Sequence, residues 1–294
     1  MSGALADAVT GVRKLPRAEF PELLGQIHDP PRVLYLRGAG EAELLARPAV
    51  AIVGARACSP YGSQVARMLG RELAAAGLVI VSGLARGVDG EAHRGALEAA
   101  GLTVAVLGCG IDRDYPAAHK DLARRICELG LVVSEYEPGV EPAPWRFPAR
   151  NRIIAGLAAA TVIVEARERS GALITADFAL EDGREVFAVP GEITGSLAAG
   201  TNRLLRQGAT PLTSAADVLD VYGVGPVPAV QPEALGPTAS CVLGRLADSS
   251  ATADELARAT GLDAGPLAAA LAELELAGLV GEADGRYRGV RLPD

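Results

Sequence analysis

The segment WRFPARNR at residues 145–152 combines two aromatic rings with three arginines and no acidic residue, and it holds the only tryptophan of the 294-residue chain. Guanidinium groups bind phosphate and stack on planar rings, and aromatic side chains stack on nucleobases. We therefore interpret this segment as a nucleic-acid contact. The alternative is a structural loop whose rings cover a sheet edge and whose arginines cap a helix. The candidate binding residues here are Phe147, Arg150, Asn151 and Arg152.

Glycine-containing turns follow several short apolar runs of the sequence, and two of these turns carry an arginine. Glycine lets backbone N–H groups approach a phosphate, and helix N-termini favour anions. Such turns therefore indicate a phosphate-binding face, although the two arginines could instead pair with nearby carboxylates. The candidates in these turns are Arg56, Ser82, Gly83, Arg86, Ser170 and Gly171.

Signatures of catalysis or of a bound cofactor are missing from the sequence. Neither G-x-G-x-x-G after the first apolar run nor G-x-x-x-x-G-K-[ST] occurs, so no dinucleotide or NTPase site is indicated. His93 lies four residues after Asp89, but a helix-borne histidine satisfied by a local carboxylate is the favoured interpretation. The three histidines and four cysteines are too dispersed for a metal site or a disulfide framework. We expect no catalytic residue, no cofactor and no metal.

Short, continuously apolar runs alternate with segments of helical spacing, which is the pattern of buried parallel strands joined by helices. The carboxyl ends of such strands meet at one edge of the sheet, where ligands bind. The sequence thus predicts an α/β fold with an extended Rossmann-like, doubly wound, mostly parallel sheet. The predicted strands lie at 50–53, 78–81, 103–106, 131–133, 161–164 and 186–189, with an edge strand at 33–36 and helices at 62–76, 90–100, 117–129 and 172–182.

A change in composition divides the chain. Residues 223–237 hold four prolines and three glycines, which is typical of a linker. We expect a short N-terminal extension at 1–19, a Rossmann-like domain at 20–222 and a small domain at 238–294.

The small domain has the pattern of a winged helix. Thr252 and Glu255 form a capping box, a second helix follows Asp263, and Asp284-Gly285 predicts a hairpin. Its expected recognition helix at 264–277 contains no lysine or arginine, and the domain has five arginines against nine acidic residues. A protein-interaction or structural role is therefore favoured over duplex DNA binding.

The overall charge sets a limit on how this chain can bind nucleic acid. Its net charge is −8, so phosphate must be bound by a local basic patch. No run of eighteen apolar residues and no signal-peptide pattern occurs, so we expect a cytoplasmic protein without membrane association.

The motifs, taken in order, resemble the DprA/Smf family of DNA-processing proteins. The matching stretches are Phe20-Pro21 through Asp29-Pro30-Pro31, VAIVGARACSPYG at 50–62, SGLARGVDGEAHRGAL at 82–97, SEYEPG at 134–139, FPARNRIIAGL at 147–157, SGALITADFALEDGREVFAVPG at 170–191, Gly200-Thr201-Asn202 and Gly208-Ala209. The resemblance covers about residues 20–213, and the small C-terminal domain also fits.

This resemblance implies a protein that binds single-stranded DNA without catalytic turnover, protects incoming DNA and loads RecA recombinase during natural transformation. It also implies a homodimer, and it assigns DNA contact to the ten candidates named above. Many members have a helical domain before the Rossmann domain, and here only about twenty residues precede the first motif. The runner-up is a nucleotide-hydrolysing enzyme similar to phosphoribohydrolases, whose PGGxGTxxE stretch is replaced here by SGALIT at 170–175 with no properly spaced glutamate.

Overall fold

A computed structural model describes residues 11–224, 235–246, 249–276, 279–283 and 285–289 of the chain. By its internal contacts the chain divides into two compact units, residues 1–227 and residues 228–294. Each unit is described by itself below. Within the described residues, no helix is both long and apolar enough to span a bilayer.

The first unit is built on a nine-stranded, mostly parallel sheet in the order β1-β2-β6-β5-β4-β3-β7-β8-β9. The seven neighbouring strands β6-β5-β4-β3-β7-β8-β9 are all parallel to one another. Strand β2 runs antiparallel to both of its neighbours, β1 and β6. All six predicted parallel strands are present. The strands are β1 (Arg13–Pro16), β2 (Val33–Arg37), β3 (Ala49–Val53), β4 (Val79–Ser82), β5 (Thr103–Leu107), β6 (Leu131–Ser134), β7 (Ala160–Ile163), β8 (Glu185–Ala188) and β9 (Thr210–Pro211).

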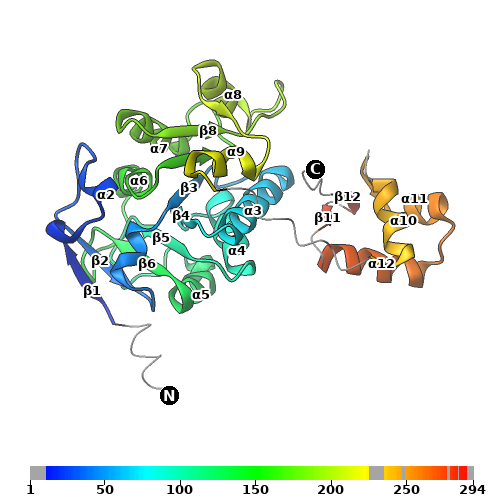
Figure 1. Ribbon diagram of the computed structural model, residues 1–294, viewed down its shortest axis with the longest axis horizontal. Coiled ribbons are helices and arrows are strands. Elements are labelled where there is room, and N and C mark those ends of the chain that lie inside the picture. The colour runs from blue at the N-terminus through cyan, green and yellow to red at the C-terminus, as the bar shows by residue number, and fades with distance from the viewer. Residues whose placement is uncertain (1–10, 225–234, 247–248, 277–278, 284, 290–294) are drawn as a thin grey trace. The chain divides into compact units, whose positions relative to one another are not determined.

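Helices cover both faces of this sheet, with α3, α4 and α5 on one face and α6 and α7 on the other (Figure 1). Alternate residues of β3 face opposite sides of the sheet. Ala51 packs in the core beneath α6 and α7, and Ile52 packs in the core beneath α3 and α4. Burial on both faces explains why the strands are continuously apolar. The helices are α2 (Glu22–Gly25), α3 (Pro60–Ala75), α4 (Val88–Glu98), α5 (Lys120–Leu129), α6 (Arg146–Gly156), α7 (Gly171–Glu181), α8 (Ala199–Arg206) and α9 (Ala215–Leu219).

Two expectations about the edges of the sheet were wrong. The predicted edge strand, β2, is not at the edge, because β1 pairs outside it through Arg13 and Leu36. Residues 13–16 therefore belong to the sheet rather than to a separate N-terminal extension. Neither β1 nor the two-residue β9 has the long apolar run that marks a buried strand.

The second unit is a winged helix. Its core is formed by apolar residues of three helices, among them Val242, Leu256 and Leu271. The predicted capping box between Thr252 and Glu255 is present, and Gly261 ends that helix in the left-handed conformation. The predicted hairpin is present on both sides of residue 284, which itself lies outside the described residues. The elements are α10 (Pro237–Leu246), β10 (Ala251–Thr252), α11 (Ala253–Thr260), α12 (Ala264–Leu276), β11 (Val280–Ala283) and β12 (Arg286–Gly289).

Candidate nucleic-acid interface

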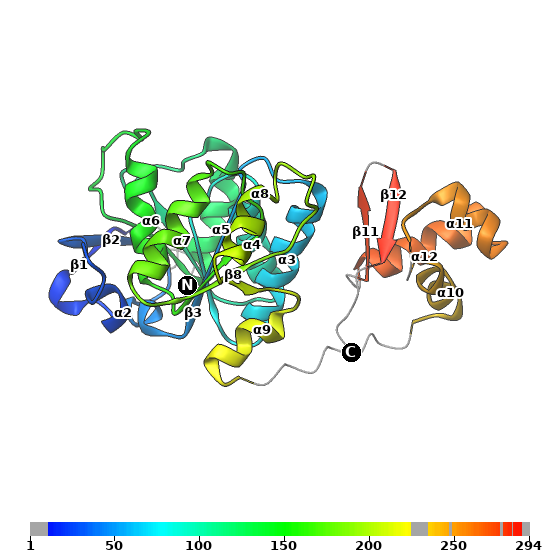
Figure 2. The same ribbon diagram turned by 90° about the horizontal axis from the view of Figure 1, so that it is seen from above.

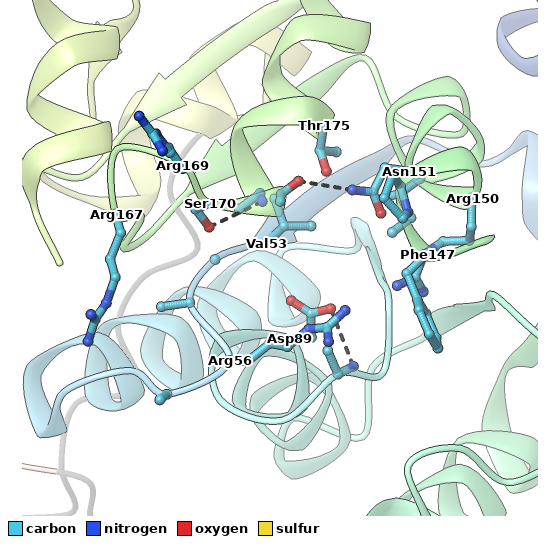
Figure 3. A pocket seen from close by; sticks show the side chains of 18 of the residues that line it. Val53, Arg56, Asp89, Phe147, Arg150, Asn151, Arg167, Arg169, Ser170 and Thr175 are labelled. Atoms are coloured by element: carbon cyan, nitrogen blue, oxygen red, sulfur yellow. Dashed lines mark hydrogen bonds between the residues drawn. The ribbon is translucent and has the colours of Figure 1, made fainter. Parts of the chain in front are cut away.

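A pocket of about 360 Å³ opens beyond the carboxyl ends of β3 and β7 (Figure 3). The chain leaves β3 toward β4 on one side, whereas β7 pairs with β3 on the other side, so this is the point where the strand order reverses. Open α/β sheets bind ligands at this topological switch point. Six of the ten residues predicted from the sequence line the pocket, namely Arg56, Phe147, Arg150, Asn151, Ser170 and Gly171.

A buried carboxylate holds the loop that carries Arg56. Glu165, which follows β7, accepts a 2.9 Å hydrogen bond from the backbone N–H of Ser59 and a 2.5 Å bond from its hydroxyl. Ser59 in turn caps α3 by accepting from the N–H of Gly62. A Cβ at Gly62 would lie 2.4 Å from a Glu165 carboxylate oxygen, so a larger residue there would displace this carboxylate from its position. The N-terminus of α3, where many related folds bind phosphate, is therefore filled by an internal anion.

The N-terminus of α7 lines the pocket. Ser170 caps this helix by accepting from the N–H of Ala172, and Gly171 is exposed to solvent. The Asn151 side chain donates a 3.0 Å hydrogen bond to the carbonyl oxygen of Gly171, which joins α6 to the start of α7. One turn further on, Thr175 lines the pocket, and its buried hydroxyl has no hydrogen-bond partner among the residues that the structure describes. A helix start with a free hydroxyl beside it is suited to bind an anion.

An arginine and two aromatic rings form a stack at the pocket wall. The guanidinium carbon of Arg56 lies 5.3 Å from the centre of the Phe147 ring, and the ring of Tyr115 stacks on Phe147 with centres 5.3 Å apart. Arg56 and Tyr115 are both exposed, while Phe147 is half-buried. Stacking holds the cation in place beside the pocket while leaving its hydrogen-bond donors available.

Arg150 points into the protein, in contrast to the exposed arginine expected from the sequence. Arg150 is 4% exposed, and its guanidinium donates a 2.7 Å hydrogen bond to the carbonyl oxygen of Gly83 and another to that of Val106. Burial lowers the pKa of Arg150 to about 10, so the group keeps its positive charge at neutral pH. Burial likewise raises the pKa of the Asp89 carboxyl, and the nearby charge of Arg150 opposes that rise.

Arg152 also has a structural environment rather than an open one. Its guanidinium bonds to the carboxylate of Glu135 at 2.6 Å and to the carbonyl oxygen of Asp29 at 2.7 Å, and its side chain does not line the pocket. It ties α6 to the segment before β2 and to the end of β6. Arg152 is thus buried and ion-paired rather than exposed at the pocket.

Three further predicted residues lie outside the pocket wall. Ser82 is fully buried and donates a 2.6 Å hydrogen bond to the carbonyl oxygen of Ile52. Gly83 makes room for Arg150, because a Cβ there would lie 2.6 Å from its guanidinium. Arg86 is exposed in the turn before α4.

Sequence reasoning missed two arginines of the pocket. Arg167 and Arg169 lie in the loop between β7 and α7, and both are exposed lining residues. Figure 3 shows them on the side of the pocket opposite Phe147 and Arg150. Among the residues that the structure describes, neither forms an ion pair, and the same holds for Arg56. Their position directly before the predicted helix start at Ser170 was the available signal.

The histidine considered for catalysis is sealed in the core. His93 is fully buried, and its Nδ1 lies 2.7 Å from the hydroxyl of Thr103. Because that hydroxyl donates its proton to the carbonyl oxygen of Ile80, the Nδ1–H of His93 must be the donor to Thr103. Its Nε2 has no partner, and burial lowers the pKa of His93 to about 3. This neutral, enclosed imidazole is a core residue, and its partner is the hydroxyl of Thr103 rather than the local carboxylate expected from the sequence.

Comparisons with known proteins agree with this architecture. The family model described as DNA recombination-mediator protein A matches residues 13–223, and that of the DprA winged helix domain matches residues 226–286. The DNA processing protein DprA of Streptococcus pneumoniae is 47% identical over 200 residues, which cover 68% of this chain and 70% of the relative. Protein Smf of Escherichia coli is 38% identical over 283 residues, which cover 92% of this chain and 75% of the relative.

Solved structures are similar as well. The X-ray structure of DNA processing protein A from Streptococcus pneumoniae superposes with a TM-score of 0.68 at 43% identity, over 75% of this chain and 77% of that one. DNA processing protein A from Helicobacter pylori, whose structure addresses its single-stranded DNA binding mode, gives a TM-score of 0.66 at 33% identity, over 73% of this chain and 97% of that one. This chain therefore belongs to the DNA-processing protein A (DprA/Smf) family.

Proposed function

We propose that this protein binds single-stranded DNA in the pocket between β3 and β7. The observation that carries the proposal is the convergence of three exposed arginines without acidic partners, a capped helix start and an aromatic ring around one pocket, within the described part of an otherwise acidic chain. Arg56, Arg167 and Arg169 provide charge for phosphates, and the ring of Phe147 provides a surface for a base.

The pocket favours an unpaired strand over a duplex. Its volume of about 360 Å³ is at the lower end of the range for small-molecule sites, which suits one nucleotide. A base can enter such a pocket only when it is free of its complement, because extracting it from a duplex costs a few kcal/mol. The proposed direct contacts are Arg56, Phe147, Arg167, Arg169, Ser170 and Gly171.

The buried predicted residues have a different part in this proposal. Arg150 and Gly83 fix α6 against the turn after β4, and Asn151 fixes α6 against the start of α7. Ser82 and Arg152 secure the surrounding strand ends. We assign these five to positioning the contact residues, and we place Arg86 at the periphery, where a long strand would pass.

Membership of the family supports the wider role that the motifs imply. In this proposal the protein is a cytoplasmic homodimer that protects incoming single strands and loads RecA recombinase on them during natural transformation. Faster RecA filament formation on single strands in the presence of this protein, and a dimeric mass in sedimentation equilibrium, are the results expected.

We further propose that binding proceeds without turnover. Asp89 is the only carboxylate that lines the described pocket, and it is buried and accepts a hydrogen bond from the backbone N–H of Ala85. It therefore stabilises the turn rather than facing a substrate. Release of a free base or phosphate from nucleoside monophosphates by the purified protein would contradict this part of the proposal.

Binding of labelled oligothymidylate, followed by fluorescence anisotropy with single-stranded and duplex competitors of equal length, tests the central proposal. We expect single strands to compete far better than duplex. Arg56→Ala should weaken binding to every sequence alike, whereas Arg124→Ala, which removes the same charge from an exposed position on α5, should not. Equal competition by duplex, or equal loss in the two variants, would contradict the proposal.

A further inference from the structure

The only tryptophan of the chain is largely exposed. Trp145 is the N-cap residue that directly precedes α6, and 69% of it is accessible to solvent. An indole contributes a large apolar surface, and burying it within a protein or against a ligand is strongly favourable. We therefore expect a ligand to cover an exposed indole that lies beside a binding pocket.

The indole of Trp145 is supported from below by a guanidinium and a second ring. The guanidinium carbon of Arg146 lies 5.6 Å from the centre of the Trp145 ring and 5.0 Å from that of Tyr136. Arg146 is further fixed because it donates a hydrogen bond to the carbonyl oxygen of Glu141. Tyr136, Arg146 and Trp145 thus form a stack whose outer member is exposed. We call these three residues the Trp145 platform.

This platform continues from the pocket wall. Phe147, which lines the pocket, is only two residues from Trp145, and both belong to the start of α6. The segment between β6 and α6, which carries Tyr136 and Glu141, stands beside the first turn of that helix (Figure 2). Tyr115, stacked on Phe147, is 42% exposed. Aromatic side chains therefore stand both in the pocket wall and, two residues away along the chain, outside the pocket lining.

The charges around the platform favour nucleobases rather than phosphates as its occupant. Glu135 is paired with Arg152, Glu141 is paired with Arg113, and Glu137 is exposed. The two paired glutamates are neutralised by their arginines and Glu137 offsets Arg146, so the platform has little net positive charge to attract a phosphate. Arg167 and Arg169, which form no ion pair among the described residues, lie across the pocket from Phe147. A single strand can satisfy both conditions, because its bases and its phosphates project to different sides.

We propose that the Trp145 platform stacks an unpaired base of the nucleotides that leave the pocket past Phe147. This inference rests on the proposed binding of single-stranded DNA, and it adds a second, outer contact for the bases. Each stacked base strengthens binding by about five- to about hundred-fold, whatever its identity. The platform therefore matters only for strands long enough to extend beyond the pocket.

Intrinsic fluorescence gives a direct test, since Trp145 is the only tryptophan. Titration with an oligothymidylate of about sixteen nucleotides should quench the emission, whereas one of only about two nucleotides should fill the pocket and leave the emission nearly unchanged. Replacing the outer nucleotides of the long strand by abasic ones should remove the quenching. Equal quenching by the abasic strand would overturn the proposal, because it would show that stacking is not involved.

Variants supply the second measurement. Trp145→Ala should weaken binding of the long strand by at least about five-fold and leave that of the short strand unchanged, and Trp145→Phe should retain most of the affinity. Leu129→Ala, at an exposed apolar residue that ends α5, is the matched control and should change neither. If Trp145→Ala binds both strands with wild-type affinity, the proposal that the Trp145 platform stacks a base is wrong. Failure of the proposed function is separate, because then wild-type protein would bind neither strand.

Discussion

The guanidinium of Arg150 donates a 2.7 Å hydrogen bond to the carbonyl oxygen of Gly83, and this joins the start of α6 to the turn after β4. The arginine most readily assigned to DNA contact from the sequence is thus turned inward. It organises the floor of the pocket, while Arg56, Arg167 and Arg169 remain at its exposed rim.

Arg150→Ala should destabilise the protein more than it alters any direct DNA contact. The change leaves the carbonyl oxygens of Gly83 and Val106 without this donor, and it removes the positive charge nearest to buried Asp89. Breaking such a buried interaction costs about 3–5 kcal/mol. Urea unfolding should show this loss, and Arg56→Ala should unfold like the wild type. Wild-type stability of Arg150→Ala would contradict the assigned role.

Glu165→Ala should loosen the loop that carries Arg56. Ser59 loses the acceptor of both its backbone N–H and its hydroxyl bond, and the N-terminus of α3 loses its internal anion. We expect a loss of about 2–4 kcal/mol in the free energy of unfolding. Glu168→Ala, at an exposed site in the same connection, is the control and should leave stability unchanged. If both variants have the same free energy of unfolding, the hydrogen bonds between Glu165 and Ser59 do not stabilise the protein.

Arg86 and Arg56 should differ in their effect on DNA binding, although the sequence presents them as equivalent. Arg56 lines the pocket and stacks on Phe147, whereas Arg86 lies outside the lining. Arg56→Ala should weaken binding of a short oligonucleotide about ten-fold, the worth of one desolvated cation contact, and Arg86→Ala should have little effect. Anisotropy titrations measure both. A larger effect of Arg86→Ala would place the strand elsewhere.

His93 should make the folded state acid-sensitive. Its pKa is about 3 in the folded protein, below its ordinary value of 6.5, so between these values only the unfolded chain takes up the proton. Its contribution to stability is complete above pH 6.5 and is lost as the pH falls, by up to about 1.4 kcal/mol per pH unit. His93→Gln should give a flatter profile of unfolding free energy between pH 4 and 7. A profile as steep as that of the wild type would exclude His93 as the cause.

The parallel core of the sheet was predictable because it is buried on both faces. Strands such as β3 and β7 are short runs that are apolar on both sides. Such runs favour a parallel sheet whose two faces are both covered by helices. β1 has the sequence RKLP and alternates between exposed and buried residues, so it lacks that signal. Its pairing depends on the tertiary contact with β2 rather than on its own composition.

The site was predictable in its location but not in the direction of its side chains. Turns at Arg56 and Ser170 follow strands whose carboxyl ends must meet, which places them together. A run of arginines cannot show which members point outward, and helix α6 turns Arg150 and Arg152 toward backbone carbonyls. Arg167 and Arg169 belong to no motif, and only their position before the helix start at Ser170 could have indicated that they reach the pocket.

The most direct test of the account is the salt dependence of single-stranded DNA affinity for the wild type and for the combined Arg56→Ala, Arg167→Ala and Arg169→Ala variant. If each arginine neutralises one phosphate, the slope of log affinity against log salt should become shallower by about 2, with the fold unchanged. A folded variant that keeps the wild-type slope and affinity would contradict the claim that this pocket is where the strand is bound.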